Sequence, residues 1–260
     1  MNSYSPMQLR EVFHLEFLRW LGRKLKPGAY AVKGGVNLRF FFKSFRYSED
    51  MDMDARGIEV AQLKDTVMKI ITSPVFQDNL KSFGIASITP PDIAKAKQTE
   101  TTQRFKLHLV LPSGEDLFTK IEFSRRGFAG NTVVEAVDNA ILRAYKLAPV
   151  LAPHYDIHAA VAQKTRALAD RATVQARDIF DLYVLSSQYP ADAKNPDQID
   201  PGVITKACER VFEVEFGQFR DTVVSYLSAE DQAVYARPQA WEEIRLKTTQ
   251  FIEELRKIHE

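Results

Sequence analysis

The spacing of hydrophobic positions predicts a helix, a strand and a second helix at the start of the chain. Residues 6–25 place apolar side chains at helical intervals, and Pro27-Gly28 predicts the end of that helix. Residues 29–33 predict a short strand that runs directly into a pair of glycines. Residues 36–43 predict a helix that begins immediately after them.

The next segments alternate between strand and helix patterns. Residues 46–54 alternate polar with apolar side chains, which predicts a strand with two different faces. Residues 58–83 are mostly helical, and Pro74 is expected to break the run. Residues 105–111 and 117–123 alternate again around a Pro-Ser-Gly-Glu turn, so we expect a β-hairpin.

After residue 132 strand patterns nearly vanish and helical spacing dominates. Ser228 and Asp231 predict the N-terminal cap of one further helix. The other helices are expected near residues 133–146, 157–171, 175–187, 202–214 and 239–258. The predicted fold class is therefore α/β (α+β), with a mixed N-terminal half and a helical C-terminal half.

Composition narrows the class of protein without fixing its function. The 260 residues are 45% hydrophobic and 27% charged, as in an ordinary soluble globular protein. No apolar run is long enough to span a bilayer, and the N-terminus does not resemble a secretion signal, so we expect a cytoplasmic protein with no membrane partner. Cys208 is the single cysteine, which excludes an intrachain disulfide. A net charge of +1 argues against a protein that coats nucleic acid, but it leaves room for a local basic groove.

Asp50 and Asp52 are the first candidates for chemistry. On a strand their side chains emerge next to each other on one face. Two adjacent carboxylates repel each other unless a cation lies between them, and oxygen ligands favour Mg²⁺ or Mn²⁺ over zinc. A solvated acidic strand end is the alternative interpretation.

Gly34-Gly35 favours the metal interpretation. A glycine pair between a strand and a helix allows phosphate oxygens to approach backbone N–H groups at the helix N-terminus. Arg46 and Ser48 are expected on the same strand face as the aspartates, where a guanidinium and a hydroxyl would hold a triphosphate.

Glu122 is the candidate for a third metal-binding carboxylate. It lies in the returning strand of the hairpin, on the face opposite Ile121 and Phe123. An exposed strand glutamate with no function is the alternative. Arg125-Arg126 follow closely, and they would contact the phosphates of an RNA acceptor or simply form a solvated loop.

Four motifs in order resemble those of the AbiEii/AbiGii-like nucleotidyltransferase toxins, within the DNA polymerase beta-type nucleotidyltransferase superfamily. The resemblance covers residues 30–187 in pieces. The motifs are Val32-Lys33-Gly34-Gly35-Val36-Asn37-Leu38, Arg46-Tyr47-Ser48-Glu49-Asp50-Met51-Asp52-Met53, Ala162-Gln163-Lys164-Thr165-Arg166-Ala167-Leu168 with Arg171, and Ala176-Arg177-Asp178-Ile179-Phe180-Asp181-Leu182-Tyr183. One departure is Val36-Asn37, where the family usually has a small hydroxyl residue. That departure puts the details of phosphate binding in doubt.

The resemblance implies a nucleotidyltransferase-like domain over residues 1–135, with a small mixed sheet flanked by helices, and a helical domain over 136–260 that completes the active site. It implies that Lys164 acts on the nucleotide and that one of Asp178 and Asp181 is needed for activity. Spacing does not choose between the two aspartates, and a surface salt bridge is the alternative for Asp181.

The function implied is transfer of a nucleoside monophosphate from an NTP to an acceptor, with Mg²⁺ or Mn²⁺ held by Asp50, Asp52 and Glu122. Lys33, Gly34, Gly35, Arg46, Ser48 and Lys164 are the expected nucleotide-binding residues. The acceptor would be the 3′ end of a tRNA or other RNA, or a protein. The biological role would be the toxin of a toxin–antitoxin or abortive-infection pair, with a cognate antitoxin as partner. A nucleotide-binding module without turnover and a metal-dependent phosphohydrolase are the alternatives.

Overall fold

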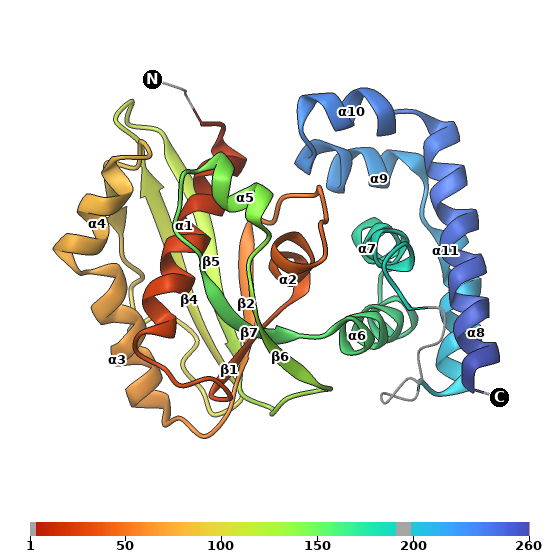
Figure 1. The fold of residues 1–260 in the computed structure, drawn as a ribbon, viewed down its shortest axis with the longest axis horizontal. Coiled ribbons are helices and arrows are strands. Elements are labelled where there is room, and N and C mark those ends of the chain that lie inside the picture. The colour runs from red at the N-terminus through yellow and green to blue at the C-terminus, as the bar shows by residue number, and fades with distance from the viewer. Residues whose placement is uncertain (1–3, 191–198, 260) are drawn as a thin grey trace. The chain divides into compact units, whose positions relative to one another are not determined.

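The structure is a computed structural model that describes residues 4–190 and 199–259 (Figure 1). The chain forms two compact units, which are described separately below. The first unit comprises Met1–Phe41, Tyr47–Phe128 and Thr132–His154. The second comprises Phe42–Arg46, Ala129–Asn131 and Tyr155–Glu260.

A mixed sheet organises the first unit. Within the described residues it has seven strands in the order β3-β4-β5-β2-β1-β7-β6. The strands are β1 (Tyr30–Lys33), β2 (Asp50–Ala55), β3 (Ser87–Thr89), β4 (Thr102–Val110), β5 (Asp116–Ser124), β6 (Thr132–Ala136) and β7 (Leu151–Tyr155). The β2 strand lies in the middle, parallel to β5 and antiparallel to β1. The strand that carries the two aspartates is therefore flanked on both sides.

Helices cover one face of this sheet. The helices of the first unit are α1 (Pro6–Gly22), α2 (Gly34–Phe41), α3 (Val60–Ile71), α4 (Pro74–Lys81) and α5 (Asn139–Ala144). Ser5 caps α1 by accepting from the Gln8 N–H, with Pro6 in the first turn, where its missing N–H costs nothing. Figure 1 shows α1 lying across the sheet with α3 and α4 beside it.

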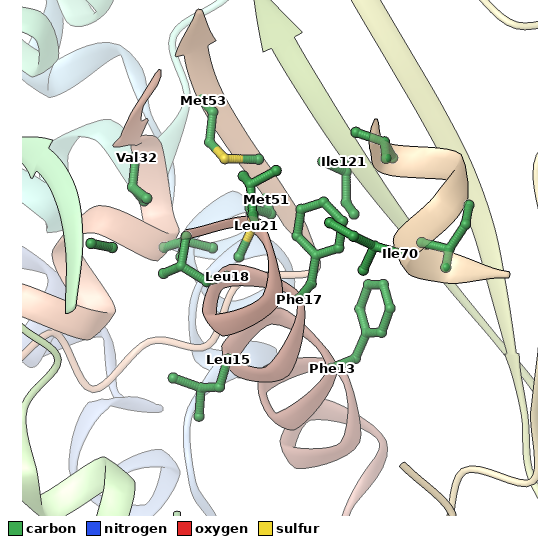
Figure 2. Packing of buried hydrophobic residues seen from close by; sticks show 14 of the residues in the cluster. Phe13, Leu15, Phe17, Leu18, Leu21, Val32, Met51, Met53, Ile70 and Ile121 are labelled. Carbon is green, nitrogen blue, oxygen red and sulfur yellow. The ribbon is translucent and has the colours of Figure 1, made fainter. Parts of the chain in front are cut away.

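The core of the first unit lies between these helices and the sheet. Phe13, Phe17 and Leu21 of α1 face Met51 of β2 and Ile121 of β5 (Figure 2). All five side chains are fully buried, and each contributes about 1.5–3 kcal/mol of burial free energy. Because the apolar side chains of β2 and β5 fill this core, their alternate polar side chains lie on the opposite face of the sheet.

Most predicted elements of the first unit are confirmed, and one prediction is wrong. The helical run after residue 58 breaks at Pro74, which begins α4. Residues 133–146 were expected to form a helix, but the structure has strand β6 followed by the short α5. The β7 strand, which contains a proline, was not predicted, and it pairs in parallel with β1. Its pairing with a distant strand, rather than its own pattern, determines its conformation.

The second unit is helical. Its helices are α6 (Ile157–Asp170), α7 (Ala176–Ser186), α8 (Pro201–Arg210), α9 (Phe216–Thr222), α10 (Ala229–Tyr235) and α11 (Pro238–His259). Ser228 caps α10, as predicted, by accepting from the Asp231 N–H. The Trp241 ring of α11 stacks on Phe219 at 4.4 Å between centroids, and its N–H donates to the Val214 carbonyl. In the described part of the chain, no helix has the length and apolar character needed to cross a bilayer.

Candidate active site

The two candidate metal-binding aspartates lie on β2, as predicted. Met51 and Met53 are fully buried, so Asp50 and Asp52 emerge on the opposite face of the strand. The strand begins at Asp50 rather than at residue 46. The prediction that Ser48 shares the strand face with the aspartates is therefore wrong. Its hydroxyl donates to the Asp50 carbonyl at 2.8 Å and fixes the start of the strand.

Glu122 lies directly across from Asp52. The β2 and β5 strands run in parallel with Asp52 opposite Glu122 and Asp50 opposite Lys120. Neighbouring strands are about 4.8 Å apart, so the third carboxylate is next to the pair rather than remote from it. Glu122 was predicted from its face of the hairpin, and the structure confirms that face, since Ile121 and Phe123 are buried on the other side.

Lys120 supplies the positive charge within this group of carboxylates. Its Nζ lies 3.1 Å from Asp50 Oδ2 and 3.6 Å from Glu122 Oε2. Burial acts to lower the pKa of Lys120, but the charges of Asp50, Asp52 and Glu122 raise it overall, so the ammonium stays protonated. Sequence reasoning missed Lys120, although its spacing of two from Glu122 places both on one strand face.

The group of carboxylates has two features that favour binding of a cation. Asp50 Oδ1 is buried and has no hydrogen-bond partner among the described residues. Burial raises the pKa of Asp52; the Lys120 ammonium opposes this, and the carboxylates of Asp50 and Glu122 add to it. An orphaned oxygen and a cluster of repelling carboxylates are the features that a divalent cation would satisfy.

The donor set therefore fits Mg²⁺ or Mn²⁺, although it is not preassembled as a ligand cage. Within the described ranges, no group of three or more His, Cys, Asp or Glu side chains is arranged to hold a metal. The Glu122 carboxylate is paired with Arg104 Nε at 2.6 Å as well as with Lys120. Burial would raise the pKa of Glu122, but these two cations more than offset it and lower the pKa, so Glu122 is an anion. The metal role of Asp50, Asp52 and Glu122 stays a prediction.

The glycine pair joins β1 to α2, as expected. Gly34 has a φ of +66°, which side chains other than glycine rarely adopt. A Cβ at this position would meet Asp52 Oδ2 at 3.3 Å, so the turn passes closely over the aspartate. The helix begins at Gly34 itself, and its first N–H groups are the phosphate donors that the sequence predicts. Lys33, one of the predicted nucleotide-binding residues, forms an ion pair with Asp54, with 2.6 Å between Nζ and Oδ1.

A separate ionic cluster lies within the helical unit. Lys164 of α6 bonds Asp178 Oδ1 at 3.0 Å and Asp181 Oδ2 at 2.6 Å, both on α7. Arg171 pairs with Asp178 at 2.8 Å. Arg46 bonds both oxygens of Asp181, at 3.1 and 3.2 Å. The prediction that Arg46 lies on the strand face with Asp50 is therefore wrong, because this side chain belongs to the α6–α7 cluster.

Burial determines the energetics of this cluster. The side chains of both aspartates are fully buried, and that of Lys164 is 11% exposed. Burial acts to raise the pKa of Asp181, but the Arg46 and Lys164 charges lower it overall. Desolvation acts to lower the pKa of Lys164, and the two aspartates raise it. Lys164 and Asp181 therefore form a buried ion pair, and Asp181 is not the surface salt-bridge partner that the alternative interpretation supposed.

Two acceptors of the first unit hold the side chain of Arg125. Its guanidinium donates to Gln103 Oε1 at 3.1 Å and to the Ile58 carbonyl. These contacts hold Arg125, whereas Arg126 is exposed, and the contact of this pair with acceptor phosphates stays a prediction.

Comparison with known proteins identifies the family of the chain. A sequence model described as "Nucleotidyl transferase AbiEii toxin, Type IV TA system" matches residues 17–256. The chain belongs to this family. The protein is accordingly a nucleotidyltransferase, and the match includes residues of both units.

Solved structures confirm the nucleotidyltransferase-like fold of the chain. MenT4, a nucleotidyltransferase toxin from Mycobacterium tuberculosis H37Rv, is 18% identical with a TM-score of 0.60, covering 97% of this chain and 86% of that one. JHP933 from Helicobacter pylori is 18% identical with a TM-score of 0.56, covering 98% and 94%. No curated protein matches the chain significantly. At this identity the structural likeness shows the fold alone.

Proposed function

We propose that this protein transfers a nucleoside monophosphate from an NTP to an acceptor hydroxyl, with Mg²⁺ or Mn²⁺ held by Asp50, Asp52 and Glu122. The observation that carries the proposal is the convergence of three carboxylates on one face of β2 and β5, with one buried Asp50 oxygen unpartnered. Divalent cations bound there would steady the attacking and leaving oxygens of the displacement.

In this proposal, backbone groups of α2 and the side chain of Lys120 bind and position the NTP. Backbone N–H groups at the start of α2, beginning with Gly34, donate to the phosphates of the NTP. The acceptor oxygen loses its proton to solvent and attacks the α-phosphorus. A new phosphorus–oxygen bond forms, the bond to the β-phosphate oxygen breaks, and pyrophosphate leaves. The Lys120 side chain, once displaced from Asp50 and Glu122, would lie beside the reacting phosphates and offset their charge.

The predicted roles of Lys164, Asp178 and Asp181 rest on the family motif. In this proposal the two aspartates hold the Lys164 side chain in one position, which their bonds to its Nζ support. Lys164 then offsets the charge of the triphosphate.

The test is incubation of the purified protein with each of the four NTPs labelled on the α-phosphate, together with magnesium and total RNA. Label that becomes linked to a macromolecule supports the proposal. Labelled nucleotide or phosphate released without an acceptor would indicate a phosphohydrolase. Binding of NTP with no chemical change would indicate an inert nucleotide-binding module. The Asp52→Asn variant is the control, because it removes one negative charge and keeps the side-chain shape.

We also propose that the protein is the toxin of a toxin–antitoxin pair that acts in the cytoplasm, where NTPs and their acceptors are present. The family to which the chain belongs supports this role. Induced expression should arrest growth, and the Asp52→Asn variant should not. Equal arrest by both would contradict a toxicity that depends on transfer.

A further inference from the structure

A basic pocket lies beside the predicted metal site, on the far side of Glu122 from Asp52. Its volume is about 280 Å³. Its charged lining comprises Lys95, Lys97, Arg104, Lys106 and Asp92. We call this the β4 pocket. It belongs entirely to the first unit.

The pocket is built by main-chain pairing rather than by flexible side chains alone. The Arg104 N–H donates to the Lys97 carbonyl at 2.8 Å. Gln98 pairs with Gln103 as an isolated β-bridge, and Gln103 Nε2 donates to Gln98 Oε1 at 2.8 Å. The segment that carries Lys97 is therefore held against β4, and main-chain contacts fix the pocket beside this strand.

Sheet register connects the pocket to the carboxylates. Arg104 lies opposite Glu122, and Lys106 lies opposite Lys120. Glu122 in turn lies opposite Asp52. A row across β2, β5 and β4 therefore consists of Asp52, Glu122 and Arg104, which are two acidic residues followed by a basic one. Two strand spacings separate β2 from β4, a distance of about 10 Å. Charge on this face thus changes from negative at β2 to positive at β4.

Two of the cations have no acidic partner. Arg104 is paired with Glu122, and Lys95 is paired with Asp92 at 3.4 Å. Lys97 and Lys106 are exposed and make no ion pair with any residue that the structure describes. Two solvated ammonium groups over a pocket of this size suit a phosphate, with which a lysine interacts as a point charge.

We propose that the β4 pocket binds a backbone phosphate of a single-stranded polynucleotide acceptor, whose terminal hydroxyl then lies at Glu122. This inference rests on the proposed function and adds the acceptor class to it. The strand order supports the assignment, because the glycine turn that would take the NTP phosphates follows β1, on the opposite side of β2 from β5 and β4. The phosphates on the β4 side are therefore those of the other substrate.

The test compares two double variants that remove the same charge. Lys97→Gln/Lys106→Gln alters the pocket, and Lys24→Gln/Lys26→Gln alters two exposed lysines in the loop after α1. Binding of a fluorescent single-stranded oligoribonucleotide with a free 3′-hydroxyl is measured by anisotropy over a series of salt concentrations. Thermal unfolding checks that each variant is folded.

The pocket variant should bind the oligoribonucleotide about 5-fold more weakly at ~0.1 M salt, and its slope of log K against log salt should fall by about 0.7, because the pocket holds one phosphate and each lost phosphate contact removes about 0.7 from the slope. The control variant should bind as the wild-type protein does. Equal binding by the two variants, or no binding by the wild-type protein, would overturn the inference. So would displacement of the oligoribonucleotide by inorganic phosphate at low concentration, which would assign the pocket to free phosphate.

A transfer assay separates this inference from the proposed function. With labelled NTP fixed and the RNA varied, the pocket variant should show a raised KM for RNA. Absence of transfer by the wild-type protein would defeat the proposed function, and the binding measurement would still decide the role of the pocket. Transfer with an unchanged KM for RNA would defeat the pocket alone.

Discussion

Replacement of Lys120 by methionine should tighten metal binding and destabilise the metal-free protein. The Lys120 ammonium is the cation that now lies between Asp50 and Glu122, at 3.1 and 3.6 Å. A divalent cation held by Asp50 and Glu122 would compete with it, because the ammonium already occupies Asp50 Oδ2 and Glu122 Oε2. Removing the ammonium leaves the carboxylates to repel one another until a metal binds.

The magnitude follows from these distances. A unit-charge pair 3.1 Å apart has a Coulomb energy of about 5 kcal/mol at an effective dielectric constant of ~20. The three side chains are partly exposed, so solvent reduces the net contribution of the pairs to about 1–2 kcal/mol. The metal-free variant should therefore unfold about 2–8 °C lower than the wild-type protein. Its affinity for Mn²⁺ should be about 5–30 times higher, since 1.36 kcal/mol corresponds to a factor of ten.

The assay is a titration of each protein with Mn²⁺ alone, followed by calorimetry and by the shift of the unfolding temperature. Lys24→Met is the matched control, because it removes one exposed positive charge in the loop after α1. The control should bind Mn²⁺ as the wild-type protein does. An affinity of Lys120→Met equal to or below that of the wild-type protein would refute the competition between the ammonium and the metal.

Three further substitutions test other parts of the account. Lys164→Met should lower the free energy of unfolding in urea by about 3–5 kcal/mol, because it leaves two buried aspartates without their shared cation. A loss of activity without a loss of stability would show that the lysine acts mainly on substrate. Gly34→Ala should cost about 1–2 kcal/mol of stability through its positive φ, and should reduce transfer by pressing on Asp52, so a variant with full activity would contradict the close approach of the turn. Burial and the neighbouring Arg10 lower the pKa of His14 from 6.5 to about 3, so the stability it contributes is present above pH 6.5 and is lost as pH falls below it. Between about pH 7.5 and pH 5 the wild-type protein should lose about 2 kcal/mol from this group, and His14→Gln should lose that much less; equal losses would show that the histidine is not buried in its neutral form.

Strand periodicity in the sequence predicts part of the candidate site. Alternation alone placed Asp50 and Asp52 on one face and Glu122 on the outer face of its hairpin. Periodicity does not give the register between strands that are distant in sequence. The pairing of Asp52 with Glu122, and the position of Lys120 and Arg104 beside them, are therefore visible only in the fold.

The incorrect predictions share a cause. The polar–apolar alternation of the aspartate strand extends back to residue 46, but pairing with β5 starts at Asp50, so Arg46 and Ser48 lie outside the sheet. The β7 strand contains a proline and owes its conformation to pairing with β1. In both places a tertiary contact overrides the local pattern.

The ionic cluster around Lys164 illustrates the same limit in a helical context. Spacing correctly placed Asp178 and Asp181 on one helix face. It did not show that this face is buried, or that Arg46 would pair with Asp181 from 135 residues away. Burial of both aspartates turns a pattern typical of a surface salt bridge into a network of buried ion pairs.

The most direct measurement of the central claim is the anomalous scattering of a crystal soaked in manganese and a non-hydrolysable NTP analogue. We expect a manganese peak within about 2.0–2.6 Å of carboxylate oxygens of Asp50 and Asp52, with the Lys120 ammonium moved away from Asp50. A manganese ion bound elsewhere, with Lys120 still paired to Asp50, would contradict the assignment of these carboxylates as the metal site.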